Sequence, residues 1–279
     1  MREVNTKEIY KAVKQMALHA DCNIDPATNE MVRAAAEKES NPTAKFALEV
    51  ILENNKIARE KNMPACQDCG MAVIFLEIGQ EVLLTGENVT KAVNQAVREA
   101  YEEGYFRKSV LDPITRINTK DNTPAVIHFE IVEGDKVTVH FLAKGFGSEN
   151  MSKLYMLKPA QGIEGVKDAI VETVRVAGAN PCPPIIVGVG IGGTMEKACL
   201  VAKKSLLREP GKHNPNPEIA AIEQEVFERI QALGIGAQGF GGDTTALCVN
   251  NDTYATHIAG LPVAVNIQCH AVRHGTMVL

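Results

Sequence analysis

The chain has 279 residues, of which 45% are apolar, and its formal net charge is −5. This composition is typical of a packed globular protein. A basic stripe that could bind a nucleic-acid backbone is absent. The first 20 residues show helical spacing instead of the continuous apolar core of a signal peptide, and no apolar run could span a bilayer. We therefore expect a soluble, cytoplasmic protein with neither a nucleic-acid nor a membrane partner.

The first third of the chain is predicted to be mainly helical. Apolar residues recur there at helical spacing over 4–20, 30–39 and 42–61. The short run 71–78 is instead rich in β-branched and aromatic residues, which predicts a buried strand. Another helix is expected over 88–102, and the segment 106–121 is irregular and polar.

Two strands are predicted next, over 124–132 and 136–143, and they flank the turn residues 133–135. Short apolar runs joined by a glycine-containing turn are typical of an antiparallel hairpin. We therefore expect these two strands to be paired with each other.

The second half alternates between helices and strands. Helical spacing recurs over 163–174, 194–207 and 216–233, and strand-like runs lie at 185–189, 246–250 and 262–271. The predicted fold class is mixed α/β, with a helical N-terminal part and a mixed sheet that contains an antiparallel hairpin and is flanked by helices. We expect a single domain over 1–279, with a loose subdivision near residue 105 as an alternative.

Seven cysteines, an odd number without an export signal, argue against a disulfide framework. Cys66 and Cys69 lie three apart in PACQDCG. A redox pair would begin a helix, whereas this pair precedes a predicted strand. A zinc ribbon would need a second CxxC, which the sequence lacks. The spacing alone favours one buried and one incidental thiol, with metal binding and redox chemistry as the alternatives.

The remaining cysteines differ in their surroundings. Cys182 lies in NPCPP, where prolines predict an irregular turn, and a proline after a cysteine recurs beside iron–sulfur ligands. An incidental turn cysteine is the equally simple interpretation. Cys269 lies near the end of a strand, and the residues alone favour a core position. The other three are interpreted as packing residues: Cys22, Cys199 and Cys248.

The stretch GVGIGG fits the dinucleotide-binding pattern GxGxxG through Gly188, Gly190 and Gly193. However, no second strand ending in an acidic residue follows the next helix, as a Rossmann unit requires. NAD binding is therefore the weaker hypothesis. The milder alternative is that main-chain amides at the start of this helix, near Thr194, hold a substrate carboxylate.

Four stretches in order resemble the class I fumarate hydratases: PACQDCGMAVIFLEIGQ, KGFGSEN, NPCPPIIVGVGIGGT and GLPVAVNIQCHAVRH. The chain is most similar to the α subunit of the two-subunit enzymes, in a family shared with L-tartrate dehydratase. The resemblance implies a [4Fe–4S] cluster bound by Cys66, Cys182 and Cys269. Three thiolates would leave one iron open to act as a Lewis acid on the substrate.

The resemblance also implies roles for residues near these cysteines. Gln67 and Asp68 match substrate-contacting positions, and Asp68 is the candidate for proton transfer or for orienting the acid and base. The alternative is that Asp68 only binds main-chain amides of its loop. Arg107 matches a carboxylate-binding arginine, although without the resemblance it would be interpreted as a solvated surface arginine. Gly147 matches a loop whose backbone approaches the substrate. Cys69 stands where the family usually has threonine.

The implied activity is the reversible hydration of fumarate to (S)-malate. L-tartrate dehydration or mesaconate hydration would use the same machinery. Single-chain members continue into a second domain, so we expect a β subunit that completes the active site, in a homodimer or heterotetramer. A metal-binding module without activity and an NAD-dependent enzyme are the alternatives from other classes.

Overall fold

The computed structural model describes residues 1–279, which form two compact units. Unit 1 consists of Met1–Asp25, Asn55–Phe146 and Arg273–Leu279. Unit 2 consists of Pro26–Asn54 and Gly147–Val272. Both units are built from segments distant in sequence. That the chain acts as one domain stays a prediction.

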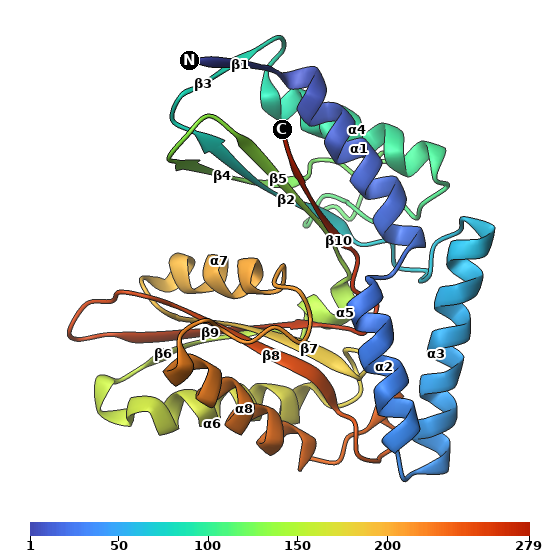
Figure 1. The fold of residues 1–279 in the computed structure, drawn as a ribbon, viewed down its shortest axis with the longest axis vertical. Coiled ribbons are helices and arrows are strands. Elements are labelled where there is room, and N and C mark those ends of the chain that lie inside the picture. The colour runs from blue at the N-terminus through green and yellow to red at the C-terminus, as the bar shows by residue number, and fades with distance from the viewer. The chain divides into compact units, whose positions relative to one another are not determined.

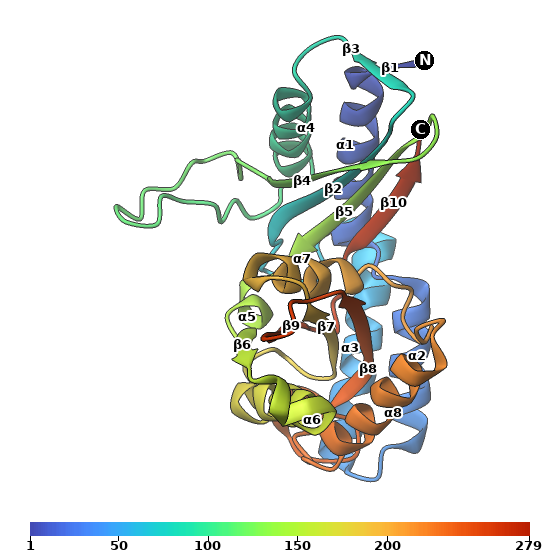
Figure 2. The ribbon, with the colours of Figure 1, turned by 90° about the vertical axis from the view of Figure 1, so that its left-hand side faces the viewer.

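Unit 1 is a four-stranded sheet with helices on one face. The strand order is β10-β5-β2-β4, and β1 pairs separately with β3. Helices α1 and α4 pack together on the sheet, and Ile9, Val13, Val93 and Val97 are among the residues of the shared core (Figure 2). The elements of this unit are β1 (Arg2–Asn5), α1 (Thr6–Cys22), β2 (Met71–Gly79), β3 (Val82–Thr85), α4 (Val89–Glu103), β4 (Val126–Val132), β5 (Val137–Lys144) and β10 (His274–Val278).

The predicted hairpin between β4 and β5 is wrong, although both strands exist. Strand β2 lies between them and pairs parallel with β4 and antiparallel with β5. The turn that joins β4 to β5 passes the end of β2, where Gly79 N–H donates to Lys136 O at 2.8 Å. Strand β2 is the most apolar of the three, so a central place with both edges paired stabilises it most.

Unit 2 contains a four-stranded sheet in the order β6-β9-β7-β8. Strand β7 pairs parallel with β8 and antiparallel with β9, so this sheet is also mixed. Its elements are α2 (Pro26–Lys38), β6 (Lys153–Leu157), α6 (Gly162–Ala177), β7 (Ile185–Gly192), α7 (Met195–Ser205), α8 (Pro217–Gln231), β8 (Ala246–Tyr254) and β9 (Leu261–Gln268). Short 3₁₀ turns lie at Pro159–Gln161 and Ala237–Gly239.

The sheet that contains β7 has helices on both of its faces in unit 2. Val187 and Val189 face the core beneath α6 and α8, whereas Ala198 and Ala202 of α7 pack on the opposite face with Ala264 (Figure 1). The result is a three-layer α/β/α arrangement. A third cluster joins α2 and the first part of α3 (Pro42–Lys61) to β7 and β8.

The predicted mixed α/β class is therefore confirmed, and most predicted elements lie within a few residues of the observed ones. The helix predicted from residue 216 begins at Pro217, and the Asn216 side chain accepts from Glu218 N–H, as a capping asparagine does. The sequence pattern missed the short strands β1, β3, β6 and β10. None of the helices combines the length and apolarity that a membrane crossing requires.

Candidate functional site

The segment Cys66–Asp68 lies in unit 1, in the loop before β2. Gly70 ends this loop with φ +74, a left-handed conformation that favours glycine. A Cβ atom at Gly70 would lie 2.9 Å from main-chain atoms of Ala143 and Lys144. Only glycine therefore lets the loop pack this closely against the end of β5.

Both oxygens of the Asp68 carboxylate accept main-chain hydrogen bonds. Oδ1 accepts from Gly70 N–H at 2.9 Å, and Oδ2 accepts from Phe146 N–H at 2.8 Å. The main-chain oxygen of Asp68 also accepts from the Arg273 guanidinium. These contacts orient a half-buried carboxylate. They also order the loop, as the alternative role for Asp68 requires, and they leave further lone pairs of the carboxylate for another partner.

A buried ion pair that the sequence reasoning missed supports this loop. Arg273 Nη1 lies 2.9 Å from Asp21 Oδ1, and both side chains are essentially inaccessible to solvent. Burial raises the pKa of Asp21, while the positive charge of Arg273 acts in the opposite direction. The sequence signal that could have indicated this ion pair is Arg273, a charged residue that closely follows an apolar strand. A charged side chain is rarely buried unless it is paired, so an acidic partner could have been expected.

Cys69 is a buried thiol that connects two segments of unit 1. Its Sγ accepts from Arg107 N–H at 3.2 Å, and its main-chain oxygen accepts from Tyr101 Oη at 2.6 Å. Burial raises the pKa of this thiol to about 11, so it is protonated near neutral pH. Cys66 and Cys69 form no disulfide. The buried-thiol interpretation of Cys69 therefore agrees with its surroundings.

Arg107 is held through its main chain and leaves its side chain exposed. On one side of it, Cys69 accepts the Arg107 N–H. On the other side, the fully buried Asn122 accepts from Ser109 N–H at 2.7 Å and donates to Gly70 O at 3.1 Å. Cys69 and Asn122 thus connect the Arg107 segment to the Cys66–Gly70 loop. No sequence pattern indicated this role of Asn122.

Gln67 and Gly147 are both exposed. The Cys66 thiol donates to Gln67 Oε1 at 3.4 Å, which keeps the amide beside the sulfur. In unit 2, a Cβ atom at Gly147 would meet only Asn180 O, at 3.7 Å, an ordinary contact. The packing of the fold therefore does not require glycine at this position, whereas Gly70 is required by its neighbours.

Cys182 lies in unit 2, in a sharp turn directly before β7. It adopts φ +54, which is uncommon for a residue with a side chain, and its N–H donates to Ala179 O at 3.1 Å. Gln238 donates to Pro183 O from both its main chain and its side chain, each at 2.8 Å. The glycine-rich stretch that contains Gln238 thus holds the turn, which is irregular as the flanking prolines predict, and the thiol is exposed.

Cys269 follows the last residue of β9 and is half-buried. Strands β7 and β9 are antiparallel, and Ile186 is the Cα partner of Gln268. The beginning of β7 and the end of β9 therefore meet at the same end of the sheet. This register brings the Cys182 turn and Cys269 to one end of unit 2, a proximity that the sequence spacing could not show.

The cysteines differ in how well they fit the cluster that the resemblance implies. Burial raises the pKa values of Cys22, Cys69 and Cys248 to about 11, which disfavours the thiolate that binds metal. Cys66, Cys182 and Cys269 form no disulfide and are at least partly exposed, so these thiols fit the role of ligands. Cys199 is also exposed, on α7. No group of three or more metal-binding side chains is assembled, and the three thiols are divided between the units.

The glycines of GVGIGG have a packing role in unit 2. A Cβ atom at Gly188 would lie 2.4 Å from Ala202 O, and one at Gly190 would lie 2.1 Å from Ala198 O. Both glycines therefore permit the close approach of α7 to β7. At the start of α7, the Thr194 hydroxyl donates to the Glu196 carboxylate at 2.6 Å. A carboxylate of the chain itself thus lies where the anion hypothesis placed a substrate carboxylate.

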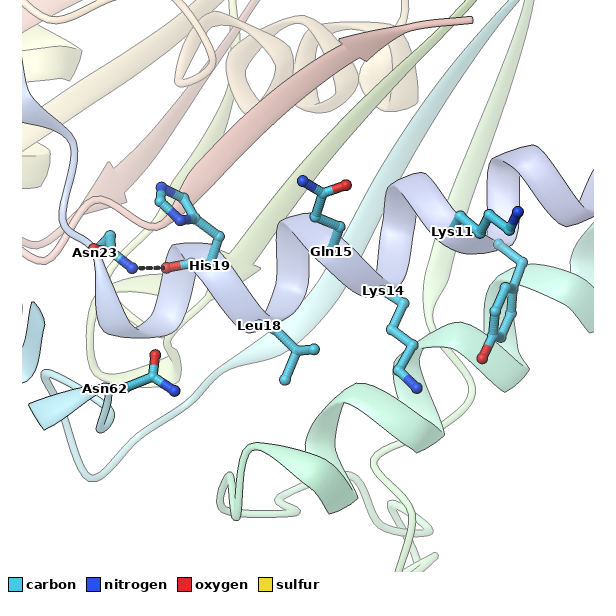
Figure 3. A pocket seen from close by; sticks show the side chains of 8 residues that line it. Lys11, Lys14, Gln15, Leu18, His19, Asn23 and Asn62 are labelled. Atoms are coloured by element: carbon cyan, nitrogen blue, oxygen red, sulfur yellow. Dashed lines mark hydrogen bonds between the residues drawn. The ribbon is translucent and has the colours of Figure 1, made fainter.

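A hollow of about 490 Å³ lies along α1 in unit 1 (Figure 3). Its lining combines basic and amide side chains, among them Lys11, Lys14, His19 and Asn23. Asn23 Nδ2 donates to His19 O at 3.0 Å, which closes the end of the helix. None of the predicted site residues lines this hollow.

These features define a mixed α/β protein that presents thiols and polar side chains from ordered loops. A model of the fumarate hydratase (Fumerase) family matches residues 10–278. A Methanocaldococcus jannaschii protein, provisionally named L(+)-tartrate dehydratase subunit alpha, is 45% identical over 271 residues, which cover 95% of this chain and 94% of the relative. The L(+)-tartrate dehydratase subunit alpha of Escherichia coli (strain K12) is 31% identical over 254 residues, 90% of this chain and 84% of the relative. The chain belongs to the fumarate hydratase family, which confirms the resemblance found in the sequence.

Proposed function

We propose that the chain is the α subunit of a [4Fe–4S]-dependent hydro-lyase that reversibly hydrates fumarate to (S)-malate. Family membership supports the hydro-lyase class. The observation that carries the proposal is the Cys66–Gly70 loop, where a partly exposed thiol lies beside a carboxylate oriented by two main-chain N–H groups. Hydration of a carbon–carbon double bond needs an oriented proton donor or acceptor and groups that hold the substrate carboxylates.

Cys66, Cys182 and Cys269 would hold the cluster, which supplies a Lewis-acidic iron for the substrate hydroxyl when it is bound. In the dehydration direction, Asp68 accepts a proton from the substrate carbon as the hydroxyl group leaves the neighbouring carbon. In the hydration direction, Asp68 returns that proton. The main-chain bonds from Gly70 and Phe146 keep the carboxylate oriented during both steps.

The proposed substrate contacts come from exposed positions. The Arg107 guanidinium binds one substrate carboxylate, and its main chain is held by Cys69 and, through Ser109, by Asn122. Gln67 donates from its amide to the substrate beside Cys66. Gly147 offers a main-chain N–H without a side chain that would fill the space. Binding through prepositioned groups lowers the entropic cost of reaching the reactive geometry.

A β subunit completes the active site in this proposal. The two relatives described above are named as alpha subunits, which supports a second kind of chain. Hydro-lyase chemistry on a dicarboxylate needs a second carboxylate clamp and an acid–base partner for the hydroxyl group. Those groups would come from the β subunit, and the assembly would be a heterotetramer.

L(+)-tartrate dehydration is the second candidate, because relatives that are 45% and 31% identical carry that name. Tartrate differs from malate by one additional hydroxyl group. A site that donates a hydrogen bond to this hydroxyl would reject malate strongly, since its polar group would be left unpaired. A site without such a donor would favour malate and fumarate.

The test is anaerobic reconstitution of the chain together with its β subunit, using iron and sulfide. Fumarate loss, malate dehydration and tartrate dehydration are then measured in parallel. We expect Cys182→Ala to lose the cluster absorbance and the activity. Cys199→Ala is the matched control, because Cys199 is also exposed but is not a proposed ligand.

An Asp68→Asn variant separates cluster binding from proton transfer. We expect it to retain the cluster and to lose at least about 100-fold in turnover. Normal cluster binding by Cys182→Ala would contradict the ligand assignment. Full turnover by Asp68→Asn would contradict the role of Asp68, and turnover of tartrate alone would replace the first substrate by the second.

A further inference from the structure

Strand β4 is an open edge of the sheet in unit 1. It pairs with β2 on one side only and ends the strand order β10-β5-β2-β4 (Figure 2). Phe129 is 49% exposed and Ile131 is 67% exposed. A long apolar edge strand is a template for pairing with another strand, and proteins usually protect such edges with charges, prolines or bulges. Within Val126–Val132, Glu130 is the only acidic residue, and lysine and proline are absent.

The main-chain groups that face outward can be assigned from one hydrogen bond. Gln80 N–H donates to Val132 O at 2.8 Å, so the main-chain groups of Val132 point toward β2. Successive residues of a strand point their N–H and C=O groups to alternate sides. Ile127, Phe129 and Ile131 therefore direct these groups to the open edge.

The same three side chains lie on the helix-covered face of the sheet. Phe129 is the Cα partner of Leu76, which belongs to the core beneath α1 and α4, and Ile127 packs against that core. His128 lies on the other face, where its ring stacks on Phe75 with centroids 4.9 Å apart. One face of β4 therefore carries the apolar side chains of Ile127, Phe129 and Ile131, and the other face carries His128 and Glu130.

In the sequence of β4, VIHFEIV, the valines and isoleucines are placed symmetrically about Phe129, and His128 and Glu130 flank it. An antiparallel pair of two such strands, centred on Phe129, sets Ile127 opposite Ile131 and valine opposite valine. It also sets His128 of each chain opposite Glu130 of the other, a pairing of a basic with an acidic side chain. The outward-facing groups of Ile127, Phe129 and Ile131 then match those of the second strand.

We propose that the β4 edge of unit 1 binds the β4 edge of a second copy of this chain, so that the two sheets join across a twofold axis at Phe129. A self-complementary surface is what such an axis requires. About six main-chain hydrogen bonds form, since three residues of each chain donate one N–H group. This assignment is independent of the catalytic proposal.

The edge strands β6 and β10 lack this symmetry. Strand β6 of unit 2 has the sequence KLYML, in which an antiparallel self-pairing sets Lys153 opposite Leu157. Strand β10 has the sequence HGTMV, which sets a histidine opposite a valine. In β4, a single twofold axis at Phe129 brings together the apolar faces, the outward main-chain groups and the oppositely charged side chains of two copies.

The segment before β4 agrees with this surface. It projects from unit 1 next to the first residues of β4 (Figure 2). Ile114 and Ile117 on this segment are largely exposed. In the antiparallel pair, the first residues of one β4 lie beside the last residues of the other. The projecting segment of each chain therefore starts next to the second sheet and can cover apolar surface there.

The test uses the full chain, alone and co-expressed with its β subunit, and sedimentation velocity over a concentration series. His128→Glu sets two acidic side chains opposite each other, and Glu130→Lys sets lysine opposite histidine. Each change occurs twice in the twofold pair, so we expect each single variant to weaken association about tenfold or more. The double variant restores an acidic–basic pair and should regain most of the affinity.

Ile131→Lys tests the edge itself, and we expect it to yield a species with a single copy of this chain. Met156→Lys on β6 is the matched control, because Met156 is 61% exposed on the edge strand of the other sheet. Circular dichroism establishes that each variant is folded. The proposal is overturned if the wild-type chain contains one copy at all concentrations, if Ile131→Lys leaves the copy number unchanged, or if the double variant is as weak as the singles. Loss of the β subunit instead of the second copy would also overturn it.

Discussion

The two units hold their proposed site residues by different means. Unit 1 fixes the Cys66–Gly70 loop with buried polar side chains, chiefly Arg273, Asp21 and Asn122. Unit 2 fixes the Cys182 turn with main-chain geometry, through the left-handed Cys182 and the contacts of Gln238 with Pro183. Side-chain charge supports the first loop, and close backbone packing supports the second.

This difference predicts different sensitivities to substitution. A buried charge that loses its partner is strongly destabilising, because the remaining charge has left water without compensation. Adding a side chain to a close-packed glycine destabilises the fold for a different reason, because the new Cβ atom overlaps neighbouring atoms. Substitutions in the two units should therefore differ in size and in how they can be rescued.

The largest effect is expected from the ion pair in unit 1. Arg273→Met leaves the Asp21 carboxylate buried without its partner, and we expect the free energy of unfolding in urea to fall by about 3–5 kcal/mol. The double variant Asp21→Asn, Arg273→Met should recover part of this loss, since it removes both charges. A single variant within about 1 kcal/mol of the wild type would contradict the proposed support of the loop.

In unit 2, Gly190→Ala is expected to be destabilising by about 1–3 kcal/mol, because the new Cβ would lie 2.1 Å from Ala198 O. The matched control is Gly147→Ala, whose Cβ would meet only Asn180 O at 3.7 Å. We expect the control to change the free energy of unfolding by less than about 0.5 kcal/mol. Equal effects of the two substitutions would show that close approach of α7 to β7 does not explain Gly190.

The thiols should differ in reactivity. Cys69 is buried with a pKa raised to about 11, whereas Cys182 is exposed in its turn. Relative to a thiol of pKa 9.0, the higher pKa reduces the Cys69 thiolate fraction at pH 7.5 about 100-fold. Iodoacetamide labelling followed by peptide mass spectrometry should modify Cys182 long before Cys69. In urea the two rates should converge, and a fast Cys69 in the folded chain would be inconsistent with its burial.

The smallest effect concerns Glu99 on α4. Hydrogen bonds from Tyr10 and Gln95, together with Lys14, lower the pKa of Glu99 from 4.5 to about 2. A lowered carboxyl pKa stabilises the folded state above pH 4.5, and this contribution is lost as the pH falls toward 2. Melting temperatures measured from pH 5 to pH 2.5 should fall less steeply for Glu99→Gln than for the wild type. Parallel curves would exclude a contribution from Glu99.

The sequence was informative wherever a local pattern determines a local structure. The helix over Pro42–Lys61 and the strand β2 were predicted from periodicity and composition. The prolines around Cys182 indicated an irregular turn, and the four ordered motifs identified the family. These features depend on neighbours in sequence or on the order of short segments.

The sequence did not predict features that depend on contacts between distant segments of the chain. The turn at 133–135 predicted a hairpin, but β2 takes the place between β4 and β5 because it is the more apolar strand. Glycines that resembled a dinucleotide motif serve the packing of α7 on β7. The roles of Asp21, Arg273 and Asn122 depend on contacts between residues far apart along the chain.

The sequence by itself determined the mixed α/β class, most element positions, the family and the candidate residues of the site. The tertiary structure decided which strands are neighbours, how Asp68 and Arg107 are held, and which thiols are buried. The physical reason is that periodicity and turn propensity act over a few residues. Burial, ion pairing and strand order depend on free-energy differences between whole arrangements of the chain.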